Sequence, residues 1–546
     1  MADDAPRDRP PHVQEDAAAS PAPRAGAVRH LLAAAAVLPL VLAAGALALV
    51  PPQDPVPVAQ AEAQSQPGST TRWCHGPLQL PEQLLDEGPD AELSVTPPST
   101  SVSLRTVSAE PESSLLFGTA SGSATLQEDD GSVRAPSIIA RDAEGDVLDD
   151  EPASQDLGVS VSGSRGVEGA ASTTSATSDG GRPVTDTLQA TSTTSGDYRS
   201  LAMTRCTEPA TEASFLGAST ETGDSSVLVL RNPTERPATA SVQLWTEDGP
   251  ASMEGRSQVV VAPGAEERVL LESVVADRAA VGVDVSVLGS PLSMHVQTTE
   301  REGLTPGGAE ILDPLPAAAT ELVMPGVDAA GSAPIVVLAN PQGTDTTASI
   351  EVVGPKGRVE AASLEDVELP AGTVHRASLD GLPEGTYSVT VRSQDPVAAV
   401  TRSERTGADL PGDTVGSPRD FTVVAPAPAL RSHGLSALPA GGSGELTLAG
   451  TADSEVTVIP VAADGSAGDP LTVRLAAGST AALTPQQLRV GDAAAVAVSI
   501  VPQVPGAVHA GWTHRVSDGA GGVLLSSFPV PTGQDSGASV TVRLEG

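Results

Sequence analysis

Alternating aliphatic and polar residues recur along the chain from about residue 214 onward, and this period of two predicts β-strands. The clearest run is VLVLRNP at Val227–Pro233, which recurs as IVVLANP at Ile335–Pro341, 108 positions later. Asn232 and Asn340 are the only asparagines in the sequence, and each stands before a proline at the end of an aliphatic run. The pattern predicts a repeated β-domain.

Six elements follow in the same order in two copies, over about 105 residues each. A proline-containing turn ends at Gly264 in the first copy and at Gly372 in the second. A third, weaker copy has Gly450-Thr451 where Asn-Pro would stand. We predict repeats over residues 207–315, 316–420 and 421–546.

Each repeat contains short alternating strands separated by Gly, Pro and Asp turns. This spacing predicts a mainly β protein built of tandem antiparallel β-sandwiches of immunoglobulin-like kind. A β-propeller-like fold is the alternative, and it is disfavoured because propeller blades repeat at about 40 to 50 residues.

Asn232-Pro233 and Asn340-Pro341 are interpreted as structural turns. An asparagine side chain can bond to the backbone two residues on, and proline fixes φ, so the pair ends a strand sharply. Proline after Asn232 also excludes N-glycosylation there.

Residues 74–206 are rich in Ser and Thr and show only short alternations. We predict a divergent β-domain that is closed by a disulfide between Cys74 and Cys206, the only two cysteines. A bridge across a loop of this size contributes about 4 to 5 kcal/mol in the chain-entropy model. A thiol nucleophile is the less favoured alternative.

The first 73 residues divide into three segments of different composition. Residues 1–30 lack apolar periodicity and predict a disordered cytoplasmic tail. Residues 31–50 are uncharged and span about 30 Å as a helix, which predicts a transmembrane anchor; a cleaved signal peptide is the alternative. Residues 51–73 predict a Pro- and Gln-rich linker.

Arg24 and Arg29 precede the apolar segment, and no cation follows it until Arg72. The positive-inside rule therefore leaves the N-terminus in the cytoplasm and the bulk of the chain outside a cell membrane crossed once.

The formal charge is −39, and the 30 Lys and Arg residues are dispersed along the chain. Nucleic-acid binding is therefore not expected. Lys356, the only lysine, is followed by Gly357 and Arg358, which excludes a phosphate-binding P-loop and so nucleotide binding of that kind.

Motifs for chemistry are not found in the sequence. The eight histidines form no HExxH or spaced Cys/His set, no Gly-x-Ser-x-Gly elbow occurs, and the alternation at Asp142, Glu144 and Asp146 lacks the other EF-hand positions. We expect no metal, cofactor or catalysis. His295, His509 and His514 are expected on strand surfaces, and Trp73, Trp245 and Trp512 in cores.

Several short motifs resemble one family. They are Cys74-His-Gly-Pro77, Arg205-Cys206-Thr-Glu-Pro209, Phe215-Leu-Gly217, Leu230-Arg-Asn-Pro-Thr234 and Val261-Ala-Pro-Gly264. The chain from Cys74 onward resembles an actinobacterial family of membrane-anchored envelope proteins catalogued as a domain of unknown function. This resemblance implies a location in the cell envelope and assigns no catalytic residues.

The sequence favours a structural or protein-interaction role in the bacterial cell envelope, with envelope proteins or cell-wall polymer as partners. A cell-wall glycan- or polymer-binding protein is the alternative, which would gain support if Trp245 and Trp512 were exposed on one face. An envelope hydrolase with scattered carboxylates is a lesser alternative.

Overall fold

The computed structural model describes residues 68–79, 96–110, 114–116, 119–121, 135–148, 152–154, 158–168, 172–178, 182–253, 255, 257–409 and 416–533. As predicted, these residues are mainly β. They form antiparallel strands and the short 3-10 helices η2 (Leu271–Ser273) and η3 (Glu360–Ala362). Residues Gln64–Gly546 make up one compact unit.

The tail and the segment 31–50 lie outside the described residues. Within the described residues, no helix has the length and apolar character needed to cross a membrane. The linker expected over 51–73 differs at its end, because Gly68–Trp73 form strand β1, which pairs with β8.

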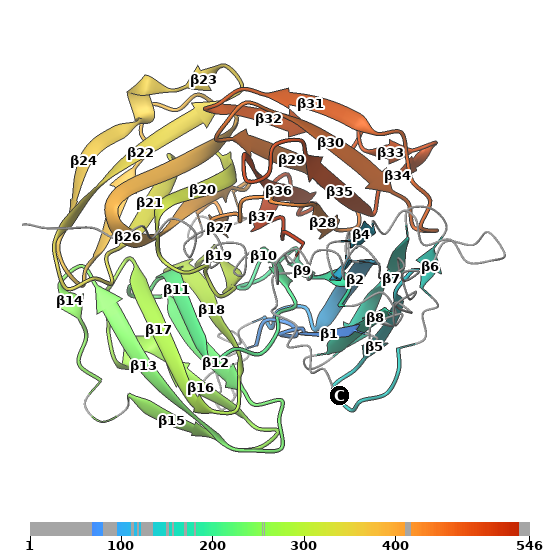
Figure 1. Ribbon diagram of the computed structural model, residues 1–546. Helices are drawn as coiled ribbons and strands as arrows, with labels where there is room; N and C mark the ends of the chain where they lie inside the picture. Colours follow the sequence, from blue (N-terminus) through green and yellow to red (C-terminus); the bar gives the residue numbers. More distant parts are fainter. Residues whose placement is uncertain are drawn as a thin grey trace, which may run out of the picture. The chain divides into compact units, whose positions relative to one another are not determined.

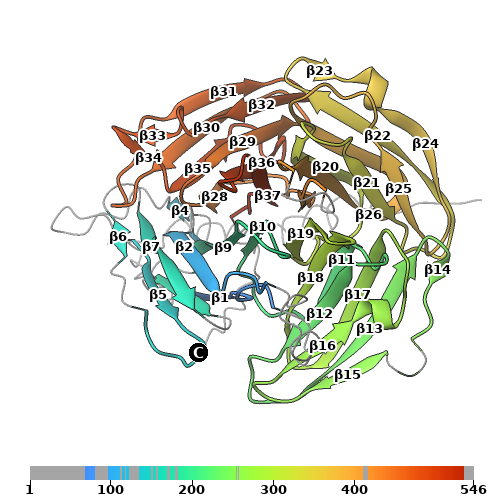
Figure 2. The same cartoon turned by 180° about the vertical axis from the view of Figure 1, so that it is seen from behind.

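The described strands form paired sheets, one pair from the N-terminal region and one from each repeat (Figures 1 and 2). The N-terminal pair comprises β1 (Gly68–Trp73), β2 (Ser101–Ala109), β5 (Ser137–Arg141), β6 (Ala153–Ser154), β7 (Val159–Glu168), β8 (Thr173–Ser178), β9 (Val184–Thr193) and β10 (Ser200–Arg205). Its sheets have the orders β1-β8-β5 and β10-β9-β2-β7-β6, and a separate hairpin joins β3 (Ser114–Leu116) to β4 (Thr119–Ser121).

The first repeat has an outer sheet of order β11-β17-β13-β14, with β15 also on β13, and an inner sheet of order β16-β12-β18-β19. Its strands are β11 (Glu212–Ala218), β12 (Ser225–Arg231), β13 (Ala238–Thr246), β14 (Gly249–Pro250), β15 (Gln258–Val261), β16 (Glu266–Leu270), β17 (Val281–Gly289), β18 (Ser293–Glu302) and β19 (Thr305–Leu312).

In the second repeat one long strand, β26, belongs to both sheets. Its first part pairs with β20 and β22, and its last part pairs with β21 and β27. The strands are β20 (Ala319–Asp328), β21 (Ile335–Ala339), β22 (Thr346–Gly354), β23 (Gly357–Arg358), β24 (Leu364–Leu369), β25 (Val374–Ser378), β26 (Thr386–Thr406) and β27 (Arg419–Val424).

The third repeat has sheets of order β28-β35-β30-β31 and β32-β29-β36-β37, beside a small β33-β34 pair. Its strands are β28 (Gly434–Ala437), β29 (Ser443–Gly450), β30 (Ser454–Val461), β31 (Leu471–Leu475), β32 (Ser479–Leu483), β33 (Arg489–Val490), β34 (Ala493–Ala494), β35 (Ala497–Pro502), β36 (Val508–Ser517) and β37 (Val523–Pro529).

Aliphatic side chains that alternate along the strands fill the space between paired sheets. In the first repeat, Leu228 of β12 and Leu244 of β13 are fully buried in one core although they belong to different sheets. The core of the third repeat continues into the N-terminal pair, where it includes Val107 and Leu188. The first and last parts of the described chain therefore share a hydrophobic core.

Contacts between the four sheet pairs close a circle. Strand β10 contacts β19, β19 contacts β27, β27 contacts β37, and β37 contacts β10. Both views show these four strands at the centre, with the remaining strands of each pair outside them (Figures 1 and 2). Each of the four is the last described strand of its region, so each region contributes its final described strand to the centre.

Candidate functional site

The four central strands lie at the edges of their sheets, so one backbone edge of each has no strand partner among the described residues. Buried N–H groups on such an edge need acceptors from elsewhere. Asp420 of β27 accepts two such hydrogen bonds through one oxygen. Its Oδ2 accepts from the Leu201 N–H of β10 at 3.3 Å and from the Leu525 N–H of β37 at 2.9 Å. One carboxylate oxygen thus links three sheet pairs.

Hydroxyl groups continue this pattern at every second residue. Ser526 Oγ accepts from the Met203 N–H at 3.2 Å, and Thr422 Oγ1 accepts from the Ser527 N–H at 2.8 Å. Asp313, which follows β19, accepts from the Arg205 N–H at 3.0 Å. Because outward N–H groups of an edge strand come at alternate residues, side chains of neighbouring regions replace the missing strand. We call this set the central polar core.

Asp420 is buried at 0 % exposure, and Glu310 of β19, which we add to the central polar core, is buried at 3 %. Burial raises the pKa of both carboxyls well above the ordinary value, and the charge of Asp420 raises the pKa of Glu310 further. Ser526 Oγ donates to Glu310 Oε2 at 3.3 Å. Gly308 (φ 106°) faces Asp420, and a Cβ there would lie 2.9 Å from Asp420 Oδ1, so only glycine fits.

A second cluster joins the N-terminal pair to the first repeat through residues 74–79, which we call the clasp. The predicted Cys74–Cys206 disulfide is present. Gly76 exchanges two hydrogen bonds with the Gln189 side chain, at 2.9 and 2.5 Å. Gln79 exchanges two with the Gln297 side chain of β18, at 2.8 and 2.6 Å. Each end of the clasp is thus fixed to a different sheet pair.

His75 lies in the middle of the clasp. Its ring packs against that of His295, with the centroids 4.3 Å apart, and its Nε2 is 3.4 Å from Asp313 Oδ1. Burial lowers the pKa of His295 well below its ordinary value, and the neighbouring His75 lowers it further. The pair is therefore most stable when His295 is neutral.

Arg205, beside Cys206, faces the other neighbour of the N-terminal pair. Its guanidinium pairs with Asp186, donates to the Pro529 carbonyl at 2.8 Å and lies 4.7 Å from the centre of the Phe528 ring. Arg205 therefore links the N-terminal pair to the third repeat, whereas Cys206 is bonded to the clasp that reaches the first repeat.

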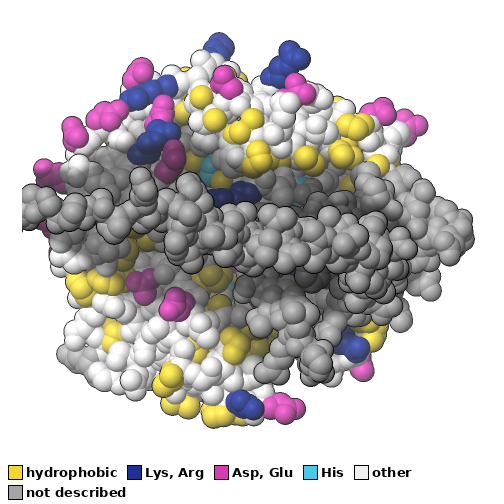
Figure 3. All heavy atoms as spheres, viewed as in Figure 1, with side chains coloured by type: hydrophobic (Ala, Val, Ile, Leu, Met, Phe, Trp, Pro, Cys, Tyr) yellow, Lys and Arg dark blue, Asp and Glu magenta, His cyan; other side chains and the backbone are white. Residues whose placement is uncertain are grey.

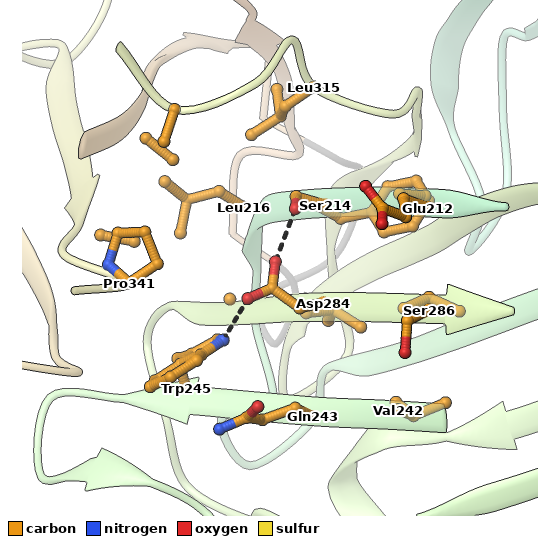
Figure 4. A pocket seen from close by; sticks show the side chains of 18 of the residues that line it. Glu212, Ser214, Leu216, Val242, Gln243, Trp245, Asp284, Ser286, Leu315 and Pro341 are labelled. Atoms are coloured by element: carbon orange, nitrogen blue, oxygen red, sulfur yellow. Dashed lines mark hydrogen bonds between the residues drawn. The ribbon is translucent and has the colours of Figure 1, made fainter. Parts of the chain in front are cut away.

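The described surface also has a groove. A cavity of about 460 Å³ lies over the outer sheet of the first repeat, between β11, β13 and β17 and the 315–318 connection. At its centre Asp284 accepts from Ser214 Oγ and from Trp245 Nε1, both at 2.6 Å (Figure 4). Among the described residues that line it, none is Lys or Arg. The groove can therefore offer acceptors and an indole, but not a cation.

The sequence profile of one protein family, described as "Family of unknown function (DUF5719)", matches residues 161–486. The chain belongs to this family. The matched range begins in β7 and ends in the third repeat, so it contains β10, β19 and β27 of the central polar core together with the groove. No curated protein matched the chain.

In this DUF5719 chain the two asparagines occupy equivalent buried turns. Asn232 Oδ1 accepts from the Thr234 N–H at 3.0 Å, and Asn340 Oδ1 accepts from the Gln342 N–H at 3.0 Å. The Asn232 amide donates to the carbonyl of Val261, and that of Asn340 donates to Leu369. The prolines Pro233 and Pro341 follow directly, and the turn glycines Gly264 (φ 69°) and Gly372 (φ 70°) adopt the same left-handed conformation.

Replacing Asn232 with alanine is expected to lower the free energy of unfolding by about 1 to 3 kcal/mol. The change leaves the Thr234 N–H and the Val261 carbonyl without their side-chain partner in a buried turn. Denaturant unfolding of Asn232→Ala measures the loss. Gln342→Ala, a change of a half-buried side chain beside the equivalent turn, is the control and is expected to cost less than half as much.

Two sequence expectations about aromatic side chains need correction. His295 and His514, expected on strand surfaces, are buried at 8 % and 2 % exposure, and His509 is half-buried. Trp512 is buried as expected, whereas Trp73 and Trp245 are half-buried. The strands β18 and β36 that carry these histidines pack on both faces, so alternation does not identify a water-facing side.

Metal ligands do not gather in the described part of the chain, where no group of three or more His, Cys, Asp or Glu side chains could hold an ion. Asp142 forms a local turn in which its Oδ1 accepts from the Asp146 N–H at 2.8 Å. On the visible face of the described residues, Lys and Arg side chains are scattered among Asp and Glu side chains (Figure 3).

His514 is expected to lower the stability of the protein on acidification, in opposition to the buried carboxyls of Asp420 and Glu310, whose raised pKa has the reverse effect. Burial and, to a smaller extent, the charge of Arg515 lower the pKa of His514 to about 4, so the folded protein holds its side chain neutral above that pH. The unfolded chain takes up a proton near pH 6.5, so stability is lost as pH falls from about 6.5 to about 4. His514 contributes about 2 kcal/mol of the loss between pH 7 and pH 5.

Chemical unfolding at a series of pH values checks this expectation. His514→Phe removes the titrating group from the same buried position, so between pH 7 and pH 5 the parent is expected to lose about 2 kcal/mol of stability relative to the variant. A difference between parent and variant that does not change with pH would contradict this role of His514.

Proposed function

We propose that this protein is a structural and protein-interaction module of a bacterial cell envelope, exposed on the outer side of the membrane. The observation that carries the proposal is the closure of the circle by side chains, in which Asp420, Thr422 and Ser526 replace missing strand partners. Such cross-linking between regions favours a rigid body that presents its outer sheets to partners.

The use of the buried carboxylates supports a role without catalysis. Asp420 accepts from two backbone N–H groups, and Asp328 binds Arg405 of its own repeat and Arg515 of the next, at 2.9 and 2.5 Å. Both acids are almost fully buried, at 0 % and 1 % exposure. Their hydrogen bonds link strands of different regions, which is a structural task.

The proposed location rests on the sequence. The uncharged segment 31–50 would span the membrane, with the N-terminus in the cytoplasm and the compact unit Gln64–Gly546 outside. The Cys74–Cys206 disulfide fits an oxidising compartment. We further propose that each sheet pair is an antiparallel sandwich of immunoglobulin-like kind, because opposed sheets share one core in the first repeat.

The glycan- or polymer-binding alternative is weaker than the sequence suggested. It called for Trp245 and Trp512 on one exposed face, and Trp512 is buried at 3 % exposure. Trp245 lines the groove, but its indole N–H already donates to Asp284. Of the two tryptophans on which this alternative relied, only the half-buried Trp245 has exposed ring surface for a glycan.

Crosslinking in intact cells followed by mass spectrometry tests the proposed function. We expect crosslinks between the described surface and other envelope proteins, and protection of residues 1–30 from protease added outside the cells. Catalytic turnover by the purified protein, or crosslinks to cytoplasmic proteins, would contradict the proposal.

A further inference from the structure

We call the side of the outer sheet that faces away from the core of the first repeat the outer face. Strand register places its side chains in four rows. The rows are Leu216–Gly282–Trp245, Ser214–Asp284–Gln243, Glu212–Ser286–Ser241 and Leu288–Thr239–Val260. Residues directly opposite on antiparallel strands share a face, so all four rows point the same way.

The two ends of the outer face are apolar. In the first row Leu216 is buried at 2 % exposure against the second repeat, so the half-buried Trp245 is the apolar side chain of this row that remains accessible, and it lines the groove with Leu315 and Pro341 (Figure 4). In the fourth row, Leu288 is 81 % exposed and Val260 is 65 % exposed. Such exposed aliphatic side chains, on the two strands that flank β13, indicate a surface that meets another molecule.

The middle rows are acidic. Asp284 is held by two neutral donors, Ser214 and Trp245, and Glu212 lies in the next row. Among the described residues lining the groove, no cation offsets these carboxylates. The middle rows therefore attract a positively charged group and disfavour phosphate or other anionic polymers.

We infer that the outer face binds an extended segment of a partner polypeptide in which basic side chains are flanked by apolar ones. Rows follow one another at two-residue intervals, about 7 Å apart, which matches alternate side chains of an extended peptide. Apolar side chains would contact Leu288 and Val260 of the fourth row and the accessible part of Trp245 in the first, and Lys or Arg would lie over Asp284 and Glu212. This inference rests on the proposed interaction role.

A polypeptide fits this surface better than a glycan does. The exposed Leu288 and Val260 need an apolar contact at the far end, which aliphatic side chains provide. Trp245 is half-buried, and a Cβ added at Gly372 would lie 3.1 Å from its ring, so the indole is held against the second repeat. That position leaves less of the ring available for stacking on a sugar.

The test uses the full-length protein in intact cells, with a photo-crosslinking residue in place of Ser286. The control places the same residue at Thr457, a half-buried position on β30 in the third repeat. We expect position 286 to crosslink to a protein segment with basic residues between apolar ones, and position 457 not to capture it. Crosslinks only to glycan or lipid would overturn the inference.

A binding assay tests the charge requirement. The probe is a blocked synthetic peptide with leucine, arginine, lysine and leucine at alternate positions, separated by threonine. The affinity of the protein for this peptide is expected to fall at least tenfold in the Glu212→Gln, Asp284→Asn double variant. The Glu212→Gln single variant is expected to show a smaller fall. Glu368→Gln, which removes one exposed carboxylate of β24, is the control and is expected to bind as the parent does.

The results separate the two proposals. If a partner protein is captured at position 457 and not at 286, the interaction role stands and the outer face is the wrong surface. If the double variant binds the peptide as tightly as the parent, charge recognition by Glu212 and Asp284 is wrong. Thermal unfolding of each variant, compared with the parent, establishes that weaker binding is not caused by loss of the fold.

Discussion

Asp420→Ala is expected to lower the free energy of unfolding by about 2 to 6 kcal/mol. The substitution removes the acceptor of two buried backbone N–H groups, those of Leu201 and Leu525, and each buried donor left without an acceptor costs about 1 to 3 kcal/mol. Solvent water cannot replace the lost acceptor, because Asp420 is fully buried where three sheet pairs meet. Denaturant unfolding followed by circular dichroism measures the loss.

Two comparisons make this expectation specific. Asp420→Asn keeps a carbonyl oxygen that can accept from both N–H groups, so it is expected to cost less than the alanine variant. Glu368→Ala changes an exposed acid of β24 and is expected to alter stability by less than about 0.5 kcal/mol. If Asp420→Ala costs no more than Glu368→Ala, the central polar core does not hold the circle together.

Loss of the Cys74–Cys206 disulfide is expected to cost about 4 to 5 kcal/mol in the chain-entropy model, because the bridge closes a loop across a sequence separation of 132. The Cys74→Ser, Cys206→Ser double variant, unfolded by denaturant, measures the loss. Because the bridge fixes one end of the clasp, hydrogen exchange at Gly76 and Gln79 is expected to rise more than exchange in β21 or β22.

Reducing agent provides the control for the disulfide. It is expected to destabilise the parent protein to about the level of the double variant and to leave the double variant unchanged. Free thiols in the untreated protein, or a double variant as stable as the parent, would contradict the assigned bridge and weaken the proposed location outside the membrane.

The motifs behind the family resemblance have a common physical explanation. Cys74, Gly76 and Cys206 fix the clasp to the N-terminal pair, and Arg205 reaches the third repeat. Asn232 and its proline end a strand in a buried turn. These motif residues hold regions together or fix a turn of the backbone. Their residue types therefore follow from structural roles and do not form a catalytic motif.

The sequence by itself determined the local features of this protein. Alternation in VLVLR and IVVLA predicts strands, Asn-Pro predicts the turns that follow, and the distance between the copies predicts a repeat. An isolated pair of cysteines predicts the disulfide. The strands and turns follow from interactions between residues that are close in the chain. The disulfide follows because each cysteine has only one other cysteine in the chain to pair with.

Only the tertiary structure decided how the regions meet. In β27 the pattern Arg-Asp-Phe-Thr places Asp420 and Thr422 on the polar side, where alternation predicts contact with water. They instead meet the edges of β10 and β37, more than 100 residues away in sequence. His514 is likewise buried on a strand that packs on both faces. Alternation distinguishes two faces of a strand, but whether the polar face meets solvent or another region depends on contacts that no local pattern encodes.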